Sequence, residues 1–170
     1  QANNHSTAHD AQVIAFAMYA GNMKVAREVI NAIPRKRLFT QIEPDGKQPH
    51  ELRRTLAFGY SQFNLSHFID IFMMARKIGI SIDNATSEDG RSFYKAMDFL
   101  VPYVGKDVKA WPYQQISEWK YKQQEFCKDL YRTFLLNPER KDYLKLYKTH
   151  RIIDWKDRFN LLWMEADDVD

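Results

Sequence analysis

The fold is decided most clearly by residues 10–34, which read DAQVIAFAMYAGNMKVAREVINAIP. Apolar residues recur there at helical spacing, and Gly21-Asn22 and Pro34 are residues that end helices. The apolar side chains expected on one face of the first helix are Val13, Phe16, Ala17 and Ala20. Two helices, over residues 10–20 and 23–33, separated by a tight turn predict an antiparallel helical hairpin.

The same spacing returns along most of the remaining chain. Further helices are expected over residues 51–78 (with a break near Gly59), 91–104, 114–136 and 138–150. Residues 35–50 are expected to form a long loop, because they contain Pro44, Asp45-Gly46 and Pro49. No stretch predicts a strand, so the expected fold class is all-α, with about six helices in antiparallel pairs.

Successive helical hairpins indicate an α/α toroid or a solenoid. A closed ring needs more hairpins than 170 residues supply at about 11–12 residues per helix plus loops. We therefore expect residues 1–170 to form one domain that is an incomplete barrel, with an open face for an upstream helical segment of the same protein. The chain begins on Gln1 without an initiator Met, which indicates a processed product or an internal piece of a longer protein.

The amino-acid composition narrows the possible classes of protein only moderately. Hydrophobic residues make up 45% and charged residues 28%, as in ordinary globular proteins. The net charge of +3 suits a polyanionic ligand weakly, and it lacks the dense basic stripe of a nucleic-acid binder. No apolar run is long enough to cross a membrane. The single cysteine, Cys127, excludes an internal disulfide and is expected to be buried. Residues 152–170 contain an apolar patch at 159–164 and an acidic end, and that end is expected to be a solvated terminus.

Three polar segments stand out from the helical pattern. The first is Asn3-Asn4-His5-Ser6-Thr7, which alone is typical of a helix cap. Residues 41–55 read QIEPDGKQPHELRRT, and residues 58–65 read FGYSQFNL; alone, these are typical of a turn and then a helix with a buried tyrosine. His5 and His9 have a spacing that can bind a metal, but no nearby Glu or Cys completes such a site.

In this order and at these intervals, the three segments resemble the alginate lyase domain family. Further similarity lies in the pattern Asn-His-x-Thr-x-x-Asp-x-Gln at residues 4–12, in DGRS at 89–92 before a helix ending in Leu-x-Pro-Tyr at 100–103, and in WPY at 111–113. The resemblance implies an α/α toroid, of which this chain is the C-terminal part. It implies cleavage of a uronate polysaccharide, alginate or a related polymer, by β-elimination without a metal or cofactor, in the periplasm or outside the cell.

Two positions depart from the family pattern. Ala8 and His9 stand where similar proteins often have an aromatic pair, and Gly59 stands where they often have a larger polar residue such as His. Both changes bear on the shape of the sugar subsites, and so on the choice of substrate more than on the reaction class.

The resemblance assigns catalytic roles that suit the chemistry. β-Elimination removes the weakly acidic C5 proton of a uronate, so donors must neutralise the neighbouring carboxylate as charge develops. Asn4, His5 and an arginine are implied in that role. Tyr60 is implied as the base and then the acid; a free phenol has a pKa of about 10, which nearby positive charge lowers.

Two arginines compete for the third position. If residues 51–60 form one regular helix, Arg53 lies on the same face as Tyr60, seven residues later. The family pattern Glu-Leu-x-Arg instead selects Arg54, which we assign as the catalytic arginine, with Arg53 second. Substrate contacts are expected from Asn3, Gln48, Arg53 and His67, although a core or capping role is the alternative for His67.

Other interpretations of the sequence stay open. Tyr103, Trp111 and Tyr113 could stack on sugars or pack in the core. A carbohydrate-binding relative without turnover, or a helical scaffold for protein partners, are the alternatives to an enzyme. The sequence leaves open which uronate polymer is bound, whether attack is internal or at chain ends, and the oligomeric state.

Overall fold

The computed structural model describes residues 2–153 and 156–163, and within them the prediction of an all-helical fold is confirmed. The longer helices are α1 (Asn4–Tyr19), α2 (Met23–Ile33), α5 (Ala57–Lys77), α6 (Phe93–Leu100), α7 (Trp119–Leu136) and α8 (Lys141–His150). The shorter ones are the π-helix Pro34–Leu38, α3 (Phe39–Gln41), α4 (Pro49–Leu52), the 3₁₀ turns Val101–Tyr103 and Val108–Ala110, and α9 (Arg158–Trp163). None of the described helices is both long and apolar enough to span a bilayer.

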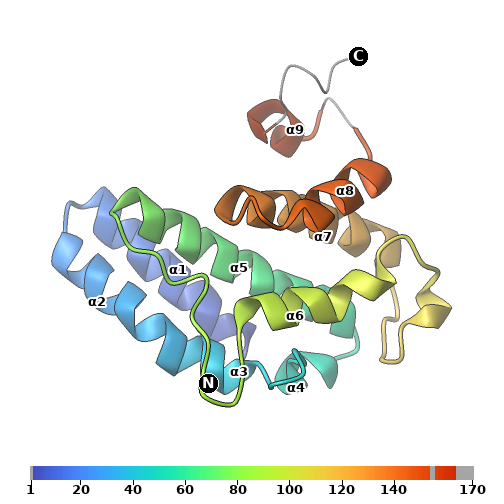
Figure 1. The fold of residues 1–170 in the computed structure, drawn as a ribbon, viewed down its shortest axis with the longest axis horizontal. Coiled ribbons are helices and arrows are strands. Elements are labelled where there is room, and N and C mark those ends of the chain that lie inside the picture. Colours follow the sequence, from blue (N-terminus) through green and yellow to red (C-terminus); the bar gives the residue numbers. More distant parts are fainter. Residues whose placement is uncertain (1, 154–155, 164–170) are drawn as a thin grey trace.

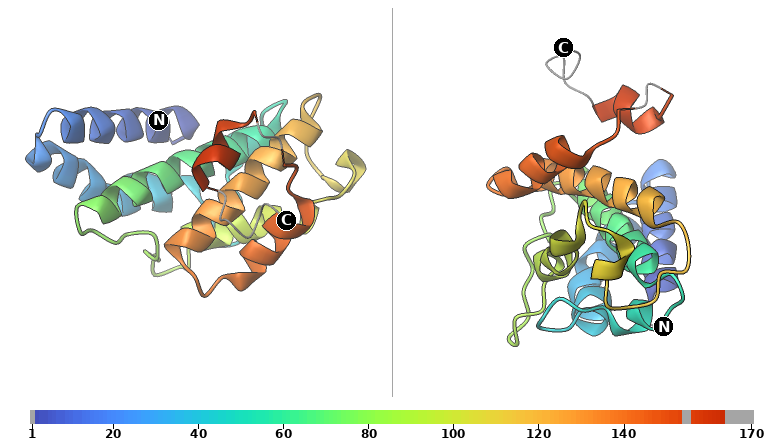
Figure 2. Two further views of the ribbon diagram at one scale, coloured as in Figure 1. Left: turned by 90° about the horizontal axis from the view of Figure 1, so that it is seen from above. Right: turned by 90° about the vertical axis from the view of Figure 1, so that its right-hand side faces the viewer.

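The long helices form two layers, and the helices of one layer run opposite to those of the other (Figures 1 and 2). In one layer α1, α5 and α7 run in the same direction, with α5 packed between the other two. Each is paired with a returning helix: α2 packs on α1, α6 on α5, and α8 on α7. The N-terminal ends of α1 and α5 therefore lie at the same end of the layer, next to α3 and α4.

Helix α1 begins at Asn4, six residues before the start expected from its apolar pattern. The expected face was only partly right, because Ala17 is buried but Phe16 is 70% exposed and Ile14 is buried instead. The buried stripe of α1 is Asn4, Thr7, Asp10, Ala11, Ile14 and Ala17. Half of these residues are polar, so hydrophobic periodicity could not identify the stripe.

The second helix ends at Ile33 as expected, but the helical path does not stop at Pro34. The chain continues from α2 through a π-helical turn, Pro34–Leu38, into α3, which ends at Gln41. A proline lacks the N–H that closes the regular hydrogen bond, and π-helix, although rare, occurs mostly as single turns within a longer helical path. The expected long loop over residues 35–50 is thereby shortened to residues 42–48.

The helix expected over residues 51–78 is interrupted at residues 53–56, and Gly59 lies inside α5. The interruption is fixed by a distant segment, because Ala57 N–H donates to the Gln114 carbonyl and Ile116 N–H donates to the Thr55 carbonyl. The Gln115 side chain then accepts from the Phe58 and Gly59 N–H groups, which have no partner within the helix. This pairing also explains why α7 starts at Trp119 instead of residue 114.

The core is centred on aromatic residues of α5 and its neighbours. Phe58 makes edge-to-face contacts with Trp111, Trp119 and Phe126, at centroid distances of 5.4, 5.0 and 5.8 Å. Trp111 is 4% exposed, so it packs in the core and is not available to stack on a sugar. Cys127 is buried as expected, and burial raises the pKa of its thiol to about 12. The expected acidic end, residues 165–170, lies outside the described residues.

A comparison of Gly46, in the loop before α4, with Gly79, which follows α5, tests how tightly that loop is held. Gly46 and Gly79 both have positive φ, so alanine at either position is strained by about 1–2 kcal/mol. A Cβ at Gly46 would lie 2.1 Å from the Lys95 carbonyl oxygen, whereas one at Gly79 would meet nothing within 4 Å. We expect Gly46→Ala to lower the free energy of unfolding clearly more than Gly79→Ala in urea denaturation. Equal losses would show that the loop yields without cost.

Candidate active site

A buried network of amide side chains joins the three polar segments identified in the sequence. The Gln41 Oε1 atom accepts from Thr7 Oγ1 at 3.0 Å and from Asn64 Nδ2 at 2.8 Å. The Gln41 Nε2 atom donates to the Asn3 carbonyl at 3.3 Å and to Ser6 Oγ at 3.2 Å. One glutamine side chain thus fixes the start of α1 against the second turn of α5.

Gln48 extends this network towards Tyr60. Its Oε1 atom accepts from Asn64 Nδ2 at 2.8 Å, and its Nε2 atom donates to the Ser61 carbonyl at 3.2 Å. Gln48 is 3% exposed. Both ends of its amide group are engaged inside the protein, so we assign Gln48 a structural role in place of the substrate contact expected from the sequence.

Glu51 holds Asn4. Its carboxylate accepts from the Asn4 backbone N–H at 2.8 Å and also from Asn4 Nδ2, and both residues are almost completely buried. The Asn3 side chain makes no capping hydrogen bond, so Glu51 supplies the cap of α1 from 47 residues further along the chain. A carboxylate at this position also interacts favourably with the helix dipole.

The neighbours of Asn4 differ in their accessibility. His5, in the first turn of α1, is exposed. Asn3 is half-buried; its carbonyl belongs to the network, and its Oδ1 atom is shielded from solvent without a hydrogen-bond partner. Among the described residues, no group of three or more His, Cys, Asp or Glu side chains is arranged to hold a metal ion.

Arg54 is the arginine that contacts Tyr60. Its guanidinium carbon lies 4.1 Å from the centroid of the Tyr60 ring, a distance typical of a cation–π contact. The regular helix that would have placed Arg53 on the face of Tyr60 is absent, because α4 ends at Leu52. Arg53 is exposed and lines a separate cleft with Lys47 and Tyr113.

A cleft of about 210 Å³ opens beside Tyr60. We call it the Tyr60 cleft; the residues that line it are Leu56, Gly59, Tyr60, Phe63, Glu118 and Lys122. Glu118 has a φ of +59°, the one positive φ at a non-glycine residue in the described part of the chain. Strained backbone of this kind often marks functional sites.

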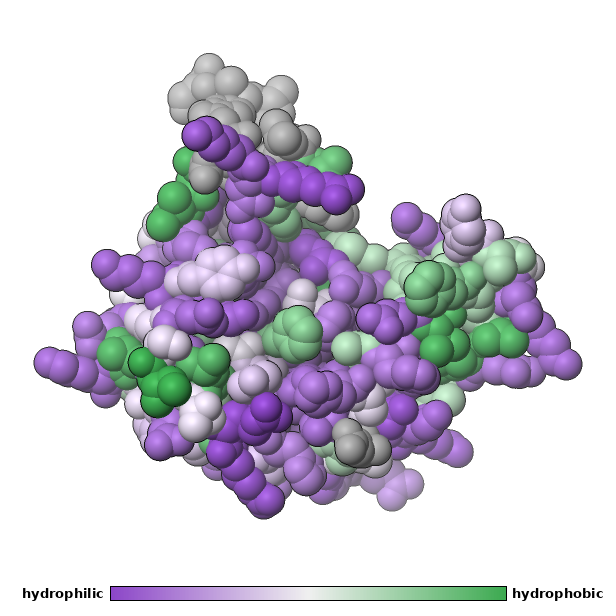
Figure 3. Space-filling view, turned by 180° about the vertical axis from the view of Figure 1, so that it is seen from behind, coloured by the Kyte–Doolittle hydropathy of each residue, from purple (hydrophilic) through white to green (hydrophobic). Residues whose placement is uncertain are grey.

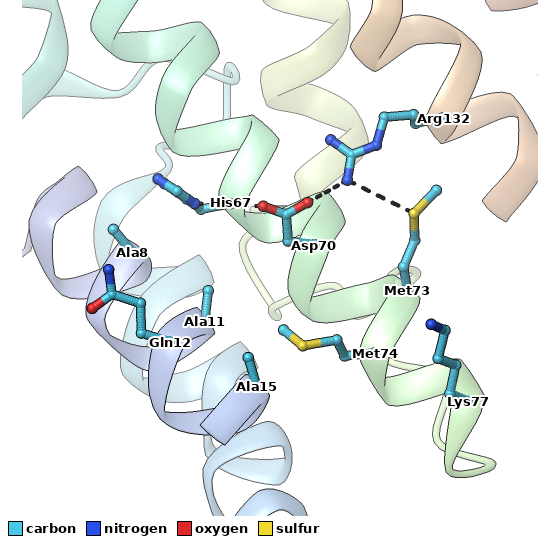
Figure 4. Close-up of a pocket in the computed structure, with 10 residues that line it drawn as sticks. All are labelled: Ala8, Ala11, Gln12, Ala15, His67, Asp70, Met73, Met74, Lys77 and Arg132. Carbon is cyan, nitrogen blue, oxygen red and sulfur yellow. Dashed lines mark hydrogen bonds and ion pairs between the residues drawn. The ribbon is translucent and has the colours of Figure 1, made fainter. Parts of the chain in front are cut away.

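A second hollow, the α1–α5 groove, continues along the same face of α5 (Figure 4). Its residues from α5 and α7 include His67, Asp70, Met74, Lys77 and Arg132, and its α1 wall includes Ala8, Gln12 and Ala15. Phe63 and His67 make an edge-to-face contact at 4.4 Å, which links the groove to the Tyr60 cleft. Seen from behind, the surface is mostly hydrophilic, with hydrophobic patches towards both sides (Figure 3).

Charged side chains under the groove are paired with one another. Arg132 binds Asp70 and lies 3.4 Å from Asp129, while His67 Nδ1 lies 3.6 Å from the other oxygen of Asp70. Burial works against ionisation of Asp70, but His67 and Arg132 lower its pKa overall. Burial raises the pKa of Asp129 to about 6, although Arg132 and a hydrogen bond from Gln62 oppose the change.

Two comparisons with known proteins bear on the family of the chain. The family model described as alginate lyase matches residues 1–111, well over half of the chain. The chain belongs to the alginate lyase family. A crystal structure of an alginate lyase from Bacteroides ovatus is 46% identical in sequence and superimposes with a TM-score of 0.92. The match covers 96% of this chain and 43% of that one, so the chain spans less than half of the Bacteroides protein. No curated protein matches it.

In this member of the alginate lyase family, sequence reasoning missed the residues that reach the candidate site from distant parts of the chain. Glu51 stands in the quoted motif, but nothing local links it to Asn4. Glu118 and Lys122 lie beyond the segment matched by the family model. The one sequence signal pointing towards them is Gly59, whose missing side chain leaves room for Lys122.

The Glu51–Asn4 pair can be tested by exchange. We expect Glu51→Gln to lower the free energy of unfolding by about 1–3 kcal/mol. The amide introduced at position 51 would place an N–H donor against the Asn4 side-chain N–H, which is also a donor, and one buried group would be left unsatisfied. Adding Asn4→Asp should restore much of that loss, since the carboxylate introduced at position 4 would accept from the new amide. Urea denaturation of the single and double variants measures this coupling; additive losses would show that the two side chains do not interact directly.

Proposed function

We propose that the intact protein is a polysaccharide lyase that cleaves alginate or a related uronate polymer by β-elimination. The observation that carries the proposal is that the buried amide network and Glu51 bring the Asn-His, Glu-Leu-x-Arg and Tyr segments together, with Arg54 against Tyr60. These segments are the ones through which the chain resembles its family.

In this proposal Tyr60 removes the C5 proton and then protonates the departing O4 of the glycosidic bond. The base and the acid are the same group, so both atoms must lie on one side of the sugar. His5 and Arg54 neutralise the carboxylate as negative charge develops. Asn4 is held by Glu51 through one N–H of its amide, and its second N–H is the donor available to the substrate.

The polymer is proposed to run from the Tyr60 cleft into the α1–α5 groove, where His67 and Lys77 can contact its carboxylates. Residues 60, 63, 67, 70, 74 and 77 are spaced by three or four, so they share one face of α5. We propose that the helices are part of an α/α toroid that an upstream helical segment completes, and that the protein acts in the periplasm or outside the cell, as its family suggests.

One observation favours a second candidate function. Asn4 is 1% exposed and already bonded to Glu51, which leaves it little freedom to follow a reacting carboxylate. A relative that binds uronate polymers without cleaving them would tolerate such an arrangement. Absorbance near 235 nm on mixing with alginate separates the two functions, because elimination creates a conjugated double bond.

Tyr60→Phe is the central test of the proposed reaction. It removes one hydroxyl and keeps the ring under Arg54, so stability and polysaccharide binding should change little. Turnover should fall by about 100- to 10,000-fold, the usual contribution of proton transfer. Asn4→Ala should keep measurable activity, because His5 and Arg54 remain.

The measurement is the rate of absorbance increase with alginate, together with binding of an alginate oligosaccharide by calorimetry. Wild-type turnover by the Tyr60→Phe variant would exclude Tyr60 as the base, and His5 would become the first candidate.

A further inference from the structure

The wall of the Tyr60 cleft opposite α5 belongs to the N-terminal end of α7. Glu118, the residue before the helix, and Lys122 in its first turn both line the cleft with Tyr60. Neither residue lies in the segment that the family model matches. The cleft therefore has a part that neither the family motifs nor the proposed mechanism assigns.

The side chain of Lys122 packs directly against Gly59. A Cβ at Gly59 would lie 3.2, 3.3 and 3.4 Å from the Cγ, Cε and Cδ atoms of Lys122. The aliphatic stem of the lysine therefore lies directly on the backbone of α5, in the space that a side chain at position 59 would need. Glycine inside a helix costs about 0.5–1 kcal/mol relative to alanine, so its use here indicates a close approach.

The ammonium group of Lys122 forms no ion pair with a carboxylate in the part of the chain that the structure describes. Its Nζ atom lies 5.1 Å from the centroid of the Tyr121 ring. Lys128, further along α7, is by contrast paired with both Glu125 and Asp157. Lys122 is a half-buried cation whose position is fixed by packing and whose charge is free to meet a ligand.

We propose that Lys122 binds a carboxylate of the uronate polymer in the Tyr60 cleft, and that Gly59 determines substrate specificity by giving the lysine its place. This inference rests on the proposed function and names a residue that recognises the substrate. Lys122 is the cation among the residues that line the cleft, while Arg54 lies on the ring of Tyr60. An anionic sugar in the cleft can therefore pair with Lys122. A neutral sugar could accept a hydrogen bond from Lys122 but would lack the ionic attraction.

Lys122→Met in the intact protein tests the proposal, because methionine keeps an unbranched stem over Gly59 and removes the charge. With alginate as substrate, KM should rise about tenfold while kcat changes little, as expected when a charge-assisted hydrogen bond of the bound state is lost. Lys120→Met is the matched control: Lys120 is exposed on the same turn and does not line the Tyr60 cleft. Its KM should equal that of the wild type.

Gly59→Ala supplies a second variant that acts through the same lysine. It should raise KM in the wild-type background, because the new Cβ displaces the stem of Lys122, and should have no further effect in the Lys122→Met background. Equal KM values for wild type and Lys122→Met would overturn the inference while leaving the proposed function intact. Absence of any alginate cleavage by the wild type would overturn the proposed function, and this inference with it.

Discussion

The arrangement of the site depends on the pairing of the buried Glu51 carboxylate with Asn4. This contact caps α1, orients the Asn4 amide and brings the short helix α4 against the start of α1. Burying a carboxylate is costly unless its oxygens are satisfied, and here one oxygen accepts from the backbone and the other from a side chain. The local structure of the Asn-His segment is therefore determined by a residue 47 positions away.

The buried amide network also joins segments that lie far apart in the sequence. Gln41, Gln48 and Asn64 exchange hydrogen bonds that join the end of α3, the loop before α4 and the second turn of α5. Because each amide must keep its partners or leave a buried group unsatisfied, the network permits one relative placement of these segments. Arg54 and Tyr60 are brought together as a consequence, although neither residue belongs to the network.

Apolar periodicity was sufficient to predict the all-helical class and the α1–α2 hairpin, since these depend on spacing within each segment. It failed at helix ends, because Glu51 and Gln115 supply the first hydrogen bonds of α1 and α5 from distant positions. Motif resemblance brought Asn4, Arg54 and Tyr60 into consideration and also suggested a substrate contact for Gln48, which the structure places inside the network. Lys122 could not be predicted, because its role depends on the packing of α7 against Gly59.

The most direct measurement of the central claim is a crystal structure of the intact Tyr60→Phe protein with a bound alginate tetrasaccharide. We predict one uronate in the Tyr60 cleft, with its carboxylate within hydrogen-bonding distance of His5 and Arg54 and its C5 facing the ring at position 60. The Asn4–Glu51 contact should persist in that complex. A tetrasaccharide bound away from the Tyr60 cleft, or a carboxylate that contacts neither His5 nor Arg54, would contradict this assignment of the site.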